Sequence, residues 1–367
     1  MRILYDQQIF SFQEYGGISR YFYELIKEAK KTKNRVLIDG KFSNSVYLPQ
    51  LKNGVVKVLP KYNFPYKNLL LFYLNSVFDS NILKSNKYDL LHVTYYHPYF
   101  LKKLKAKPYV ITVYDMIHEL YSKDYNDLNN QTAQYKRKTI SNAAKIIAIS
   151  ENTKRDLMKI YKIPEDKITV IYLGNPLESA VPSKVNNLPD KYLLFVGNRQ
   201  GYKNFTFFVN AVAPILEENE PLFLVCAGGG KLSADEKILL SKLKIKERIL
   251  QVGFKNDNEL AYLYKNALVY VLPSLYEGFG MTALEAFSMG CPVVASNNSS
   301  IPEVCGNAAV YIDPENKDSI RIGVEKVMSD RKLKVRLVGL GYAQLKKFSW
   351  GKMVKKTLNV YEKALKP

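Results

Sequence analysis

The sequence is poor in the residues that build disulfide frameworks and metal sites. Its 367 residues include three cysteines, three histidines and one tryptophan. The cysteines, Cys226, Cys291 and Cys305, are odd in number and all lie in the second half of the chain. This excludes a secreted disulfide scaffold and indicates a reducing compartment. No Cys/His cluster has zinc-site spacing, so we expect no metal site of that kind.

Long apolar runs and a leader segment are lacking as well. Residues 1–5 begin directly as a strand, without the apolar core and cleavage site of a signal peptide. The most apolar stretch, residues 69–78, contains Asn75 and Ser76 and is shorter than the ~18 residues of a transmembrane helix. We therefore expect a cytoplasmic protein, with peripheral contact on the inner face of the membrane left open.

Acidic residues are scarce: 34 Asp+Glu stand against 54 Lys+Arg, which gives a net charge of +20. A basic chain attracts nucleic acid, an anionic membrane or small polyanions such as nucleotides. Alternatively, most of the lysines only keep the protein surface hydrated. The 28 tyrosines could stack on bases, so a nucleotide- or nucleic-acid-binding protein is one alternative. No nucleic-acid-binding motif supports it.

Apolar strands followed by helices recur on both sides of a Pro- and Asn-rich linker between Gly174 and Asp190. Strands without polar alternation are typical of buried parallel sheets. We expect an α/β fold with two doubly wound, Rossmann-like domains and C-terminal helices. Ligands would then bind beyond the carboxyl ends of the strands, with the cleft between the domains as the default site. The expected strands are 2–5, 35–39, 55–59, 89–93, 109–114, 145–149, 168–171, 192–196, 222–227, 249–252, 268–272 and 293–296.

The most informative motif follows the strand that ends at residue 272. Gly278 and Gly280 precede a short helix, and glycines there let backbone N–H groups approach an anion or a hydroxyl-rich ligand. Glu277 and Glu285 lie on either side of this turn. Carboxylates accept hydrogen bonds and repel phosphate, so these two suit sugar and ribose hydroxyls.

Two further loops follow strands. Arg199 and Lys203, four residues apart, combine a planar fork with a point charge and suit a diphosphate. Gly16 and Gly17 form an anion platform at the start of a helix. They are not part of a G-x-G-x-x-G fingerprint, which disfavours an oxidoreductase or epimerase.

A third loop, just past the strand 109–114, contains Asp115, His118 and Glu119. Its position beyond a strand end makes His118 a candidate contact for a polar ligand.

Together these segments resemble glycosyltransferase family 4, the retaining nucleotide-sugar transferases with the GT-B fold. The resemblance spans most of the chain and is strongest for members that build bacterial surface polysaccharides, often mannosyltransferases. It rests on the segments already described and on Ala148-Ile149-Ser150-Glu151, Ser299-Ser300-Ile301-Pro302-Glu303-Val304, Gly306-Asn307-Ala308-Ala309 and Asp313-Pro314.

The resemblance implies a role for each position. Arg199 and Lys203 would hold the donor diphosphate. Glu277 would lie at the sugar and Glu285 at the ribose. The other donor-binding positions would be Gly16, Gly17, Val252, Gly253, Phe254, Gly278, Phe279, Gly280 and Met281. The catalytic set would be Glu277, His118, Asp115, Arg199 and Lys203.

One position departs from the family pattern. Many relatives have a histidine immediately before Asp115, where this chain has Tyr114. Either Tyr114 or His118 is then the residue that contacts the sugar.

The resemblance also implies an acceptor-binding domain over residues 1–175, a nucleotide-sugar-binding domain over 176–345 and a helix within 346–367 that packs back on the first domain. The implied reaction moves a hexose, with retention, to a hydroxyl of a glycan or lipid-linked glycan in surface polysaccharide synthesis. GDP-mannose is the expected donor and a UDP-sugar the alternative. The D-x-D pair that many sugar transferases use to hold a metal ion is missing, so no metal or other cofactor is expected.

If the acceptor is lipid-linked, two basic segments are candidate contacts with an anionic membrane. They are Lys102-Lys103-Leu104-Lys105-Ala106-Lys107 and Lys136-Arg137-Lys138. No nucleic-acid partner is expected.

Overall fold

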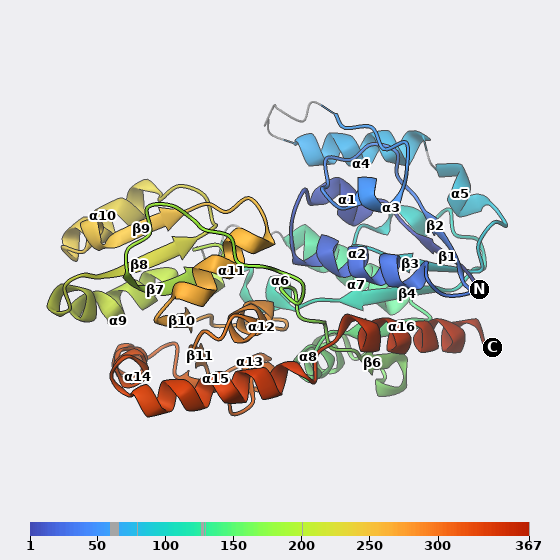
Figure 1. Cartoon of the computed structure of the whole chain (residues 1–367). Helices are drawn as coiled ribbons and strands as arrows, with labels where there is room; N and C mark the ends of the chain where they lie inside the picture. Colours follow the sequence, from blue (N-terminus) through green and yellow to red (C-terminus); the bar gives the residue numbers. More distant parts are fainter. Residues whose placement is uncertain (59–65, 79, 126–127, 129, 200, 367) are drawn as a thin grey trace. The chain divides into compact units, whose positions relative to one another are not determined.

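The computed structural model describes residues 1–58, 66–78, 80–125, 128, 130–199 and 201–366. The chain divides into two compact units (Figure 1). Unit 1 comprises Met1–Ser122, Leu128–Gly174 and Trp350–Pro367, and unit 2 comprises Lys123–Asp127 and Asn175–Ser349. Each unit contains a six-stranded parallel sheet, as expected for doubly wound domains.

The sheet of unit 1 has the strand order β2-β1-β3-β4-β5-β6. Its strands are β1 Arg2–Tyr5, β2 Arg35–Ile38, β3 Leu90–Val93, β4 Tyr109–Val113, β5 Lys145–Ala148 and β6 Ile168–Val170. The strand expected over 55–59 is wrong: Val56 forms only an isolated bridge with Phe42, and residue 59 lies outside the described part. Val56 stays 42% exposed, so no buried face stabilises a strand there.

The sheet of unit 2 has the order β12-β11-β10-β7-β8-β9. Its strands are β7 Lys191–Val196, β8 Leu222–Ala227, β9 Ile249–Val252, β10 Val269–Leu272, β11 Val293–Ser296 and β12 Ala309–Ile312. β7 and β8 are buried apart from Lys191 and the half-buried Phe223, which explains their near-continuous apolar sequences.

Helices cover the sheets of both units (Figure 1). Those of unit 1 are α1 Gln8–Phe12, α2 Gly17–Ala29, α3 Leu48–Leu51, α4 Lys67–Phe78, α5 Ser80–Lys84, α6 Ile117–Tyr121, α7 Asn130–Ser141, α8 Glu151–Tyr161 and α16 Trp350–Leu365. Those of unit 2 are α9 Phe205–Glu218, α10 Ala234–Lys242, α11 Asp257–Asn266, α12 Met281–Ser288, α13 Ile301–Cys305, α14 Lys317–Ser329 and α15 Arg331–Leu345. Local signals set several helix starts: the Ser150 hydroxyl accepts the N–H of Thr153 at the start of α8.

The strand order of each sheet reverses at one point. In unit 2 the chain passes from β7 to β8 and β9 on one side and then returns to place β10 on the other side of β7. In unit 1 the same reversal separates β1 from β3. At such a point the loops beyond neighbouring strand ends diverge and leave room for a ligand.

The C-terminal helix α16, drawn in red in Figure 1, belongs to unit 1 and packs against α2 and β5. A buried polar network joins it to the sheet. His92 Nδ1 lies 2.5 Å from the Tyr361 hydroxyl, and His92 Nε2 lies 3.0 Å from Thr112 Oγ1. The Tyr5 hydroxyl lies 3.1 Å from that of Tyr361. Burial lowers the pKa of His92 from 6.5 to about 3, so the imidazole stays neutral in the fold.

The buried His92 makes the stability of unit 1 dependent on pH. Its folded pKa lies below its unfolded value, so the unfolded chain binds the extra proton and stability falls as pH drops below about 6.5. Between pH 6.5 and 5 the wild-type protein should lose about 2 kcal/mol more than the His92→Gln variant, measured by urea unfolding. Equal losses in the two proteins would contradict this assignment.

Candidate functional site

The strand-order reversal of unit 2 brings together two of the residues expected to bind a ligand. Lys203 follows β7 and Glu277 follows β10. The Lys203 Nζ lies 2.7 Å from Glu277 Oε1, and the Ser274 hydroxyl donates to the same oxygen at 2.6 Å. Both charged side chains are largely buried. A cation and a carboxylate therefore lie side by side where a parallel sheet opens for a ligand.

Two serines after β11 fix the backbone of Glu277. Its N–H donates to Ser299 Oγ at 2.9 Å, and the Ser300 hydroxyl donates to the Glu277 carbonyl at 2.8 Å. These two bonds fix the backbone of Glu277 and therefore the position from which its carboxylate extends. Ser299 and Ser300 belong to a segment on which the family resemblance rests, but the sequence analysis assigned them no role.

Asn204, to which the sequence analysis gave no role, holds the Lys203 loop. Asn204 starts α9 in the left-handed conformation, with φ 61°. Its side-chain amide donates to the carbonyls of Pro273 at 3.1 Å and Pro314 at 2.8 Å. These bonds join the loop after β7 to the loops after β10 and β12. An asparagine next to a candidate phosphate-binding lysine is the signal that could have indicated this role.

The glycine loop after β10 leads directly into α12. Gly280 adopts φ 93°, a left-handed conformation that a side chain would strain, and no side chain caps the helix there. Gly280 itself provides no side-chain cap, so the N–H groups at the start of α12 face the loop side of the helix. Phe279, just before Gly280, packs edge-on against Phe348 with ring centroids 5.7 Å apart.

Glu285 lies further along α12, where its Oε2 accepts the Tyr264 hydroxyl of α11 at 2.8 Å. Val252, Gly253 and Phe254 lie at the end of β9, on the same carboxyl edge of the sheet. The Val252 carbonyl accepts the N–H of Gly228 at 3.1 Å, so the ends of β8 and β9 are joined.

Arg199 binds a different part of unit 2 than Lys203 does. Its Nε lies 2.9 Å from Glu236 Oε1, and its Nη1 donates to the carbonyl of Gly228 at 3.1 Å. Its Nη2 donates to the carbonyls of Gly230 and Lys231, both at 3.0 Å. Arg199 as a residue is 5% exposed. Its guanidinium holds the turn after β8. The contacts of Arg199 thus differ from those of Lys203, and the expected joint role of the two cations at a diphosphate stays a prediction.

The turn after β8 is a run of three glycines, which the sequence analysis did not identify. Gly228, Gly229 and Gly230 have φ values of 81°, 72° and 71°. A Cβ at Gly229 would lie 2.7 Å from the Gly197 carbonyl oxygen. Three consecutive glycines directly after a buried strand are the signal that could have identified the turn.

In unit 1, Gly16 and Gly17 lie at the start of α2 as the sequence indicates. A Cβ at Gly16 would lie 2.7 Å from Gln13 Oε1. The same Gln13 oxygen accepts the N–H of Ser19 at 3.1 Å, and the Ser19 hydroxyl donates to the Gly16 carbonyl at 3.0 Å. Gln13 therefore covers the glycine loop.

Asp115 lies in a buried ion cluster at the end of β4. Its Oδ1 accepts the N–H of Ile117 at 3.1 Å and lies 3.5 Å from Lys136 Nζ. Lys136 also lies 2.9 Å from Glu119 Oε2 and has no exposed surface. The expectation that Lys136 contacts a membrane is therefore wrong, because this lysine neutralises two carboxylates inside unit 1.

Tyr114 and His118 are sequence neighbours of this cluster. His118 is a half-buried residue of α6. Tyr114 is buried with its ring edge-on to Tyr21, centroids 5.8 Å apart. Within the described residues its hydroxyl has no hydrogen-bond partner, and burial raises its pKa well above 10.

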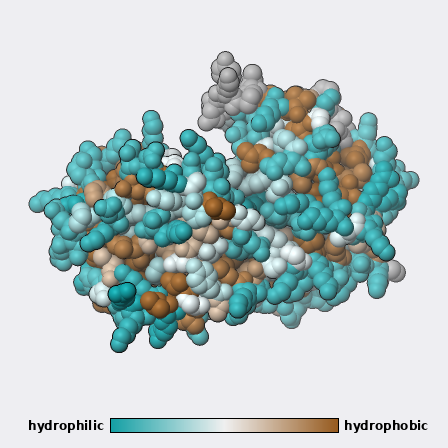
Figure 2. Space-filling view, viewed as in Figure 1, coloured by the Kyte–Doolittle hydropathy of each residue, from teal (hydrophilic) through white to brown (hydrophobic). Residues whose placement is uncertain are grey.

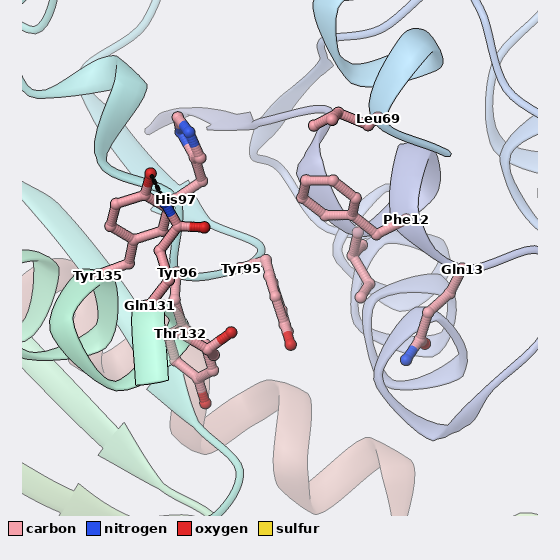
Figure 3. Close-up of a pocket in the computed structure, with 10 residues that line it drawn as sticks. Phe12, Gln13, Leu69, Tyr95, Tyr96, His97, Gln131, Thr132 and Tyr135 are labelled. Atoms are coloured by element: carbon pink, nitrogen blue, oxygen red, sulfur yellow. Dashed lines mark hydrogen bonds between the residues drawn. The ribbon is translucent and has the colours of Figure 1, made fainter. Parts of the chain in front are cut away.

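A pocket of about 380 Å³ opens in unit 1 beyond the ends of β1 and β3 (Figure 3). Figure 3 shows Phe12, Gln13 and Leu69 on one side and Tyr95, His97 and Tyr135 on the other. Its remaining lining residues are Ile9, Tyr96, Gln131 and Thr132. The pocket therefore lies at the strand-order reversal of unit 1, and aromatic rings and amide groups form its walls.

Two further properties concern the described residues as a whole. They contain no group of three His, Cys, Asp or Glu side chains arranged to hold a metal ion. Among the helices in the same part of the chain, none has the length and apolarity to cross a membrane.

Comparison with known proteins gives matches over both units. The model of Glycosyltransferase Family 4 matches residues 15–179, and that of Glycosyl transferases group 1 matches residues 178–343. An uncharacterized glycosyltransferase of Methanocaldococcus jannaschii is 31% identical over 303 residues, which is 77% of each chain. The O-antigen chain mannosyltransferase B of Escherichia coli is 28% identical over 235 residues, 61% of this chain and 62% of that protein.

Two solved structures share the fold over nearly the whole chain. Sucrose-phosphate synthase from Thermosynechococcus elongatus has a TM-score of 0.77 at 20% identity and covers 98% of both chains. Anabaena HepE, solved in complex with UDP and glucose, has a TM-score of 0.75 at 14% identity and covers 99% of both. The expected GT-B fold is confirmed. The chain belongs to glycosyltransferase family 4, and it is a glycosyltransferase.

Proposed function

We propose that this enzyme transfers a hexose, with retention and without a metal ion, from a nucleoside diphosphate sugar to a glycan or lipid-linked glycan hydroxyl. The observation that carries the proposal is the Lys203–Glu277 pair at the strand-order reversal of unit 2. Cations stabilise a leaving diphosphate, and carboxylates accept hydrogen bonds from sugar hydroxyls.

In this proposal Lys203 and Glu277 bind different parts of the donor. Lys203 moves its hydrogen bond from Glu277 to the donor diphosphate, whose negative charge grows as the glycosidic bond breaks. Glu277, still held by Ser274 and by its backbone bonds, then accepts a hydroxyl of the sugar. Glu285 binds the ribose, and the N–H groups at the start of α12 add donors at the sugar or phosphate.

The donor we favour is GDP-mannose, because several similar proteins are named mannosyltransferases, including the Escherichia coli O-antigen enzyme. The alternative is a UDP-sugar, because HepE, of the same fold, was solved with UDP and glucose. The acceptor would enter the unit 1 pocket, where Tyr95 and Tyr135 offer faces for a sugar ring.

Removing either member of the ion pair should stop catalysis and preserve the fold. We expect Lys203→Met and Glu277→Gln to lower kcat by about a hundredfold or more, since each removes a group that acts on the reacting centre. Lys154→Met is the matched control, because Lys154 lies 2.7 Å from Glu165 in an ion pair outside this site. Unchanged turnover in either site variant would refute the assignment.

Arg199 should behave differently from Lys203. Because its guanidinium holds the turn after β8 and a largely buried Glu236, we expect Arg199→Ala to lower the free energy of unfolding by about 3–5 kcal/mol. Lys203→Met should lower it by less, because it leaves intact the four carbonyl bonds that Arg199 makes to the turn after β8. Thermal and urea unfolding of both variants measure this difference. An Arg199→Ala protein with unchanged stability and lost activity would show that Arg199 acts on the donor directly.

The proposal that the reaction needs no metal ion has a direct test. Dialysis against EDTA should leave the initial rate with the preferred donor unchanged, because Lys203 and backbone N–H groups supply the positive charge. The preferred donor is identified first by thermal shift with GDP-mannose, UDP-glucose and their diphosphates. Activity that disappears with EDTA and returns with Mn²⁺ would contradict this part of the proposal.

A further inference from the structure

The lining of the unit 1 pocket is uncharged in a strongly basic chain. None of its ten residues, all within the described part of the chain, is Asp, Glu, Lys or Arg. By contrast, the whole chain has a net charge of +20, and hydrophilic residues cover most of the face that Figure 2 shows. A charged ligand would lose its hydration in this pocket without gaining a countercharge, so the lining favours an uncharged one.

A buried lysine lies over one of the lining rings. Lys136 Nζ lies 5.0 Å from the centroid of the Tyr96 ring. This lysine pairs with Asp115 and Glu119 and has no exposed surface. Its charge is therefore balanced inside unit 1 and offers no countercharge to an anion in the pocket.

The imidazole of His97, another lining residue, has a defined hydrogen position. Its Nδ1 accepts the backbone N–H of Tyr99 at 3.2 Å and caps the short 3₁₀ helix Pro98–Phe100. A ring nitrogen that accepts a hydrogen bond carries no hydrogen, so the neutral imidazole has its hydrogen on Nε2. Burial lowers the pKa of His97, which favours this neutral form.

Two aromatic rings hold the imidazole in place. Its centroid lies 4.6 Å from that of Phe72 and 4.8 Å from that of Tyr135, whose ring is edge-on to it. The Tyr135 hydroxyl in turn accepts from Gln131 Nε2 at 3.0 Å, the bond that is dashed in Figure 3. His97 lines the pocket and is only half-buried, so its Nε2–H remains for a ligand there.

Asp6 holds the loop that contains His97. It directly follows β1, is fully buried, and its Oδ1 accepts the N–H of Thr94, just after β3, at 2.8 Å. Its Oδ2 accepts Gln8 Nε2 at 2.7 Å, and Gln8 Oε1 accepts the N–H of His97 at 2.8 Å. A backbone N–H can only donate, so these bonds also fix the orientation of the Gln8 amide. The position of His97 is therefore set from both loops at the strand-order reversal of unit 1.

We propose that the Nε2–H of His97 is the specificity-determining donor of this pocket and binds an oxygen of an uncharged pyranose. Tyr95 and Tyr135 would pack against the apolar face of the sugar ring. Resting on the proposed function, this pyranose is the sugar that accepts the transferred hexose, so the acceptor sugar carries neither phosphate nor carboxylate.

The first measurement follows the imidazole itself. In protein labelled with ¹⁵N-histidine, long-range ¹H–¹⁵N spectra at neutral pH should show the His97 ring neutral with its hydrogen on Nε2; the signal is assigned by its absence from His97→Asn. The neutral probes are methyl α-mannopyranoside, methyl α-galactopyranoside and methyl β-N-acetylglucosaminide, and the charged probes are mannose 6-phosphate and glucuronic acid. At least one neutral probe should shift Nε2 at a concentration at least tenfold lower than either charged probe needs.

Two variants of His97 separate the donor from the cap. His97→Asn keeps an oxygen that can accept the Tyr99 N–H but has no donor at the place of Nε2, whereas His97→Gln can place an amide N–H there. His97→Asn should bind the best neutral probe about tenfold more weakly, and His97→Gln should regain most of that loss. In the transfer reaction the same difference should appear in the KM of an acceptor that ends in this sugar, and not in the KM of the donor.

A hydrogen on Nδ1, an Nε2 signal that no neutral probe shifts, or equal loss of binding in both variants would overturn the proposal. The spectra need neither donor nor turnover, so they separate this proposal from the proposed reaction. Shifts at His97 without transfer from any nucleotide sugar would refute the reaction alone. Transfer with an unchanged acceptor KM in His97→Asn would refute the role of His97 alone.

Discussion

The reversal of strand order in the sheet of unit 2 is the constraint on which the site depends. Parallel strands direct every following loop to one edge, and the reversal between β7 and β10 separates two of these loops. Lys203 and Glu277 come from those loops and meet at 2.7 Å. Ser299, Ser300 and Asn204 then fix the loops, so the ion pair is oriented by hydrogen bonds rather than by a packed core.

The ion pair also balances the charge of a largely buried site. A largely buried lysine is costly unless a partner balances its charge, and Glu277 provides that balance. In the proposed reaction, an incoming diphosphate replaces the carboxylate as the partner of Lys203 and releases Glu277 for a neutral sugar. The positive charge of Arg199 is balanced by other groups, because its guanidinium donates to four backbone carbonyls and pairs with Glu236. The positive charge of the chain thus serves structure, the site and the surface at different residues.

Much of this was accessible from the sequence, because apolar strands and glycine turns are local signals. The two parallel sheets, the α2 start at Gly17 and the α12 start after Gly280 follow from such patterns. Tertiary partners were not accessible: nothing near Arg199 indicates Glu236, and nothing near Lys136 indicates its complete burial. The prediction of a strand over 55–59 was wrong for the same reason, since a short apolar run alone does not show whether its side chains will be covered.

The most direct test of the account is a crystal structure with a nucleoside diphosphate bound. The account predicts a phosphate oxygen within hydrogen-bond distance of Lys203 Nζ, the Glu277 carboxylate freed from that lysine, and the ribose hydroxyls at Glu285. A nucleotide bound elsewhere, with the Lys203–Glu277 contact intact, would contradict it.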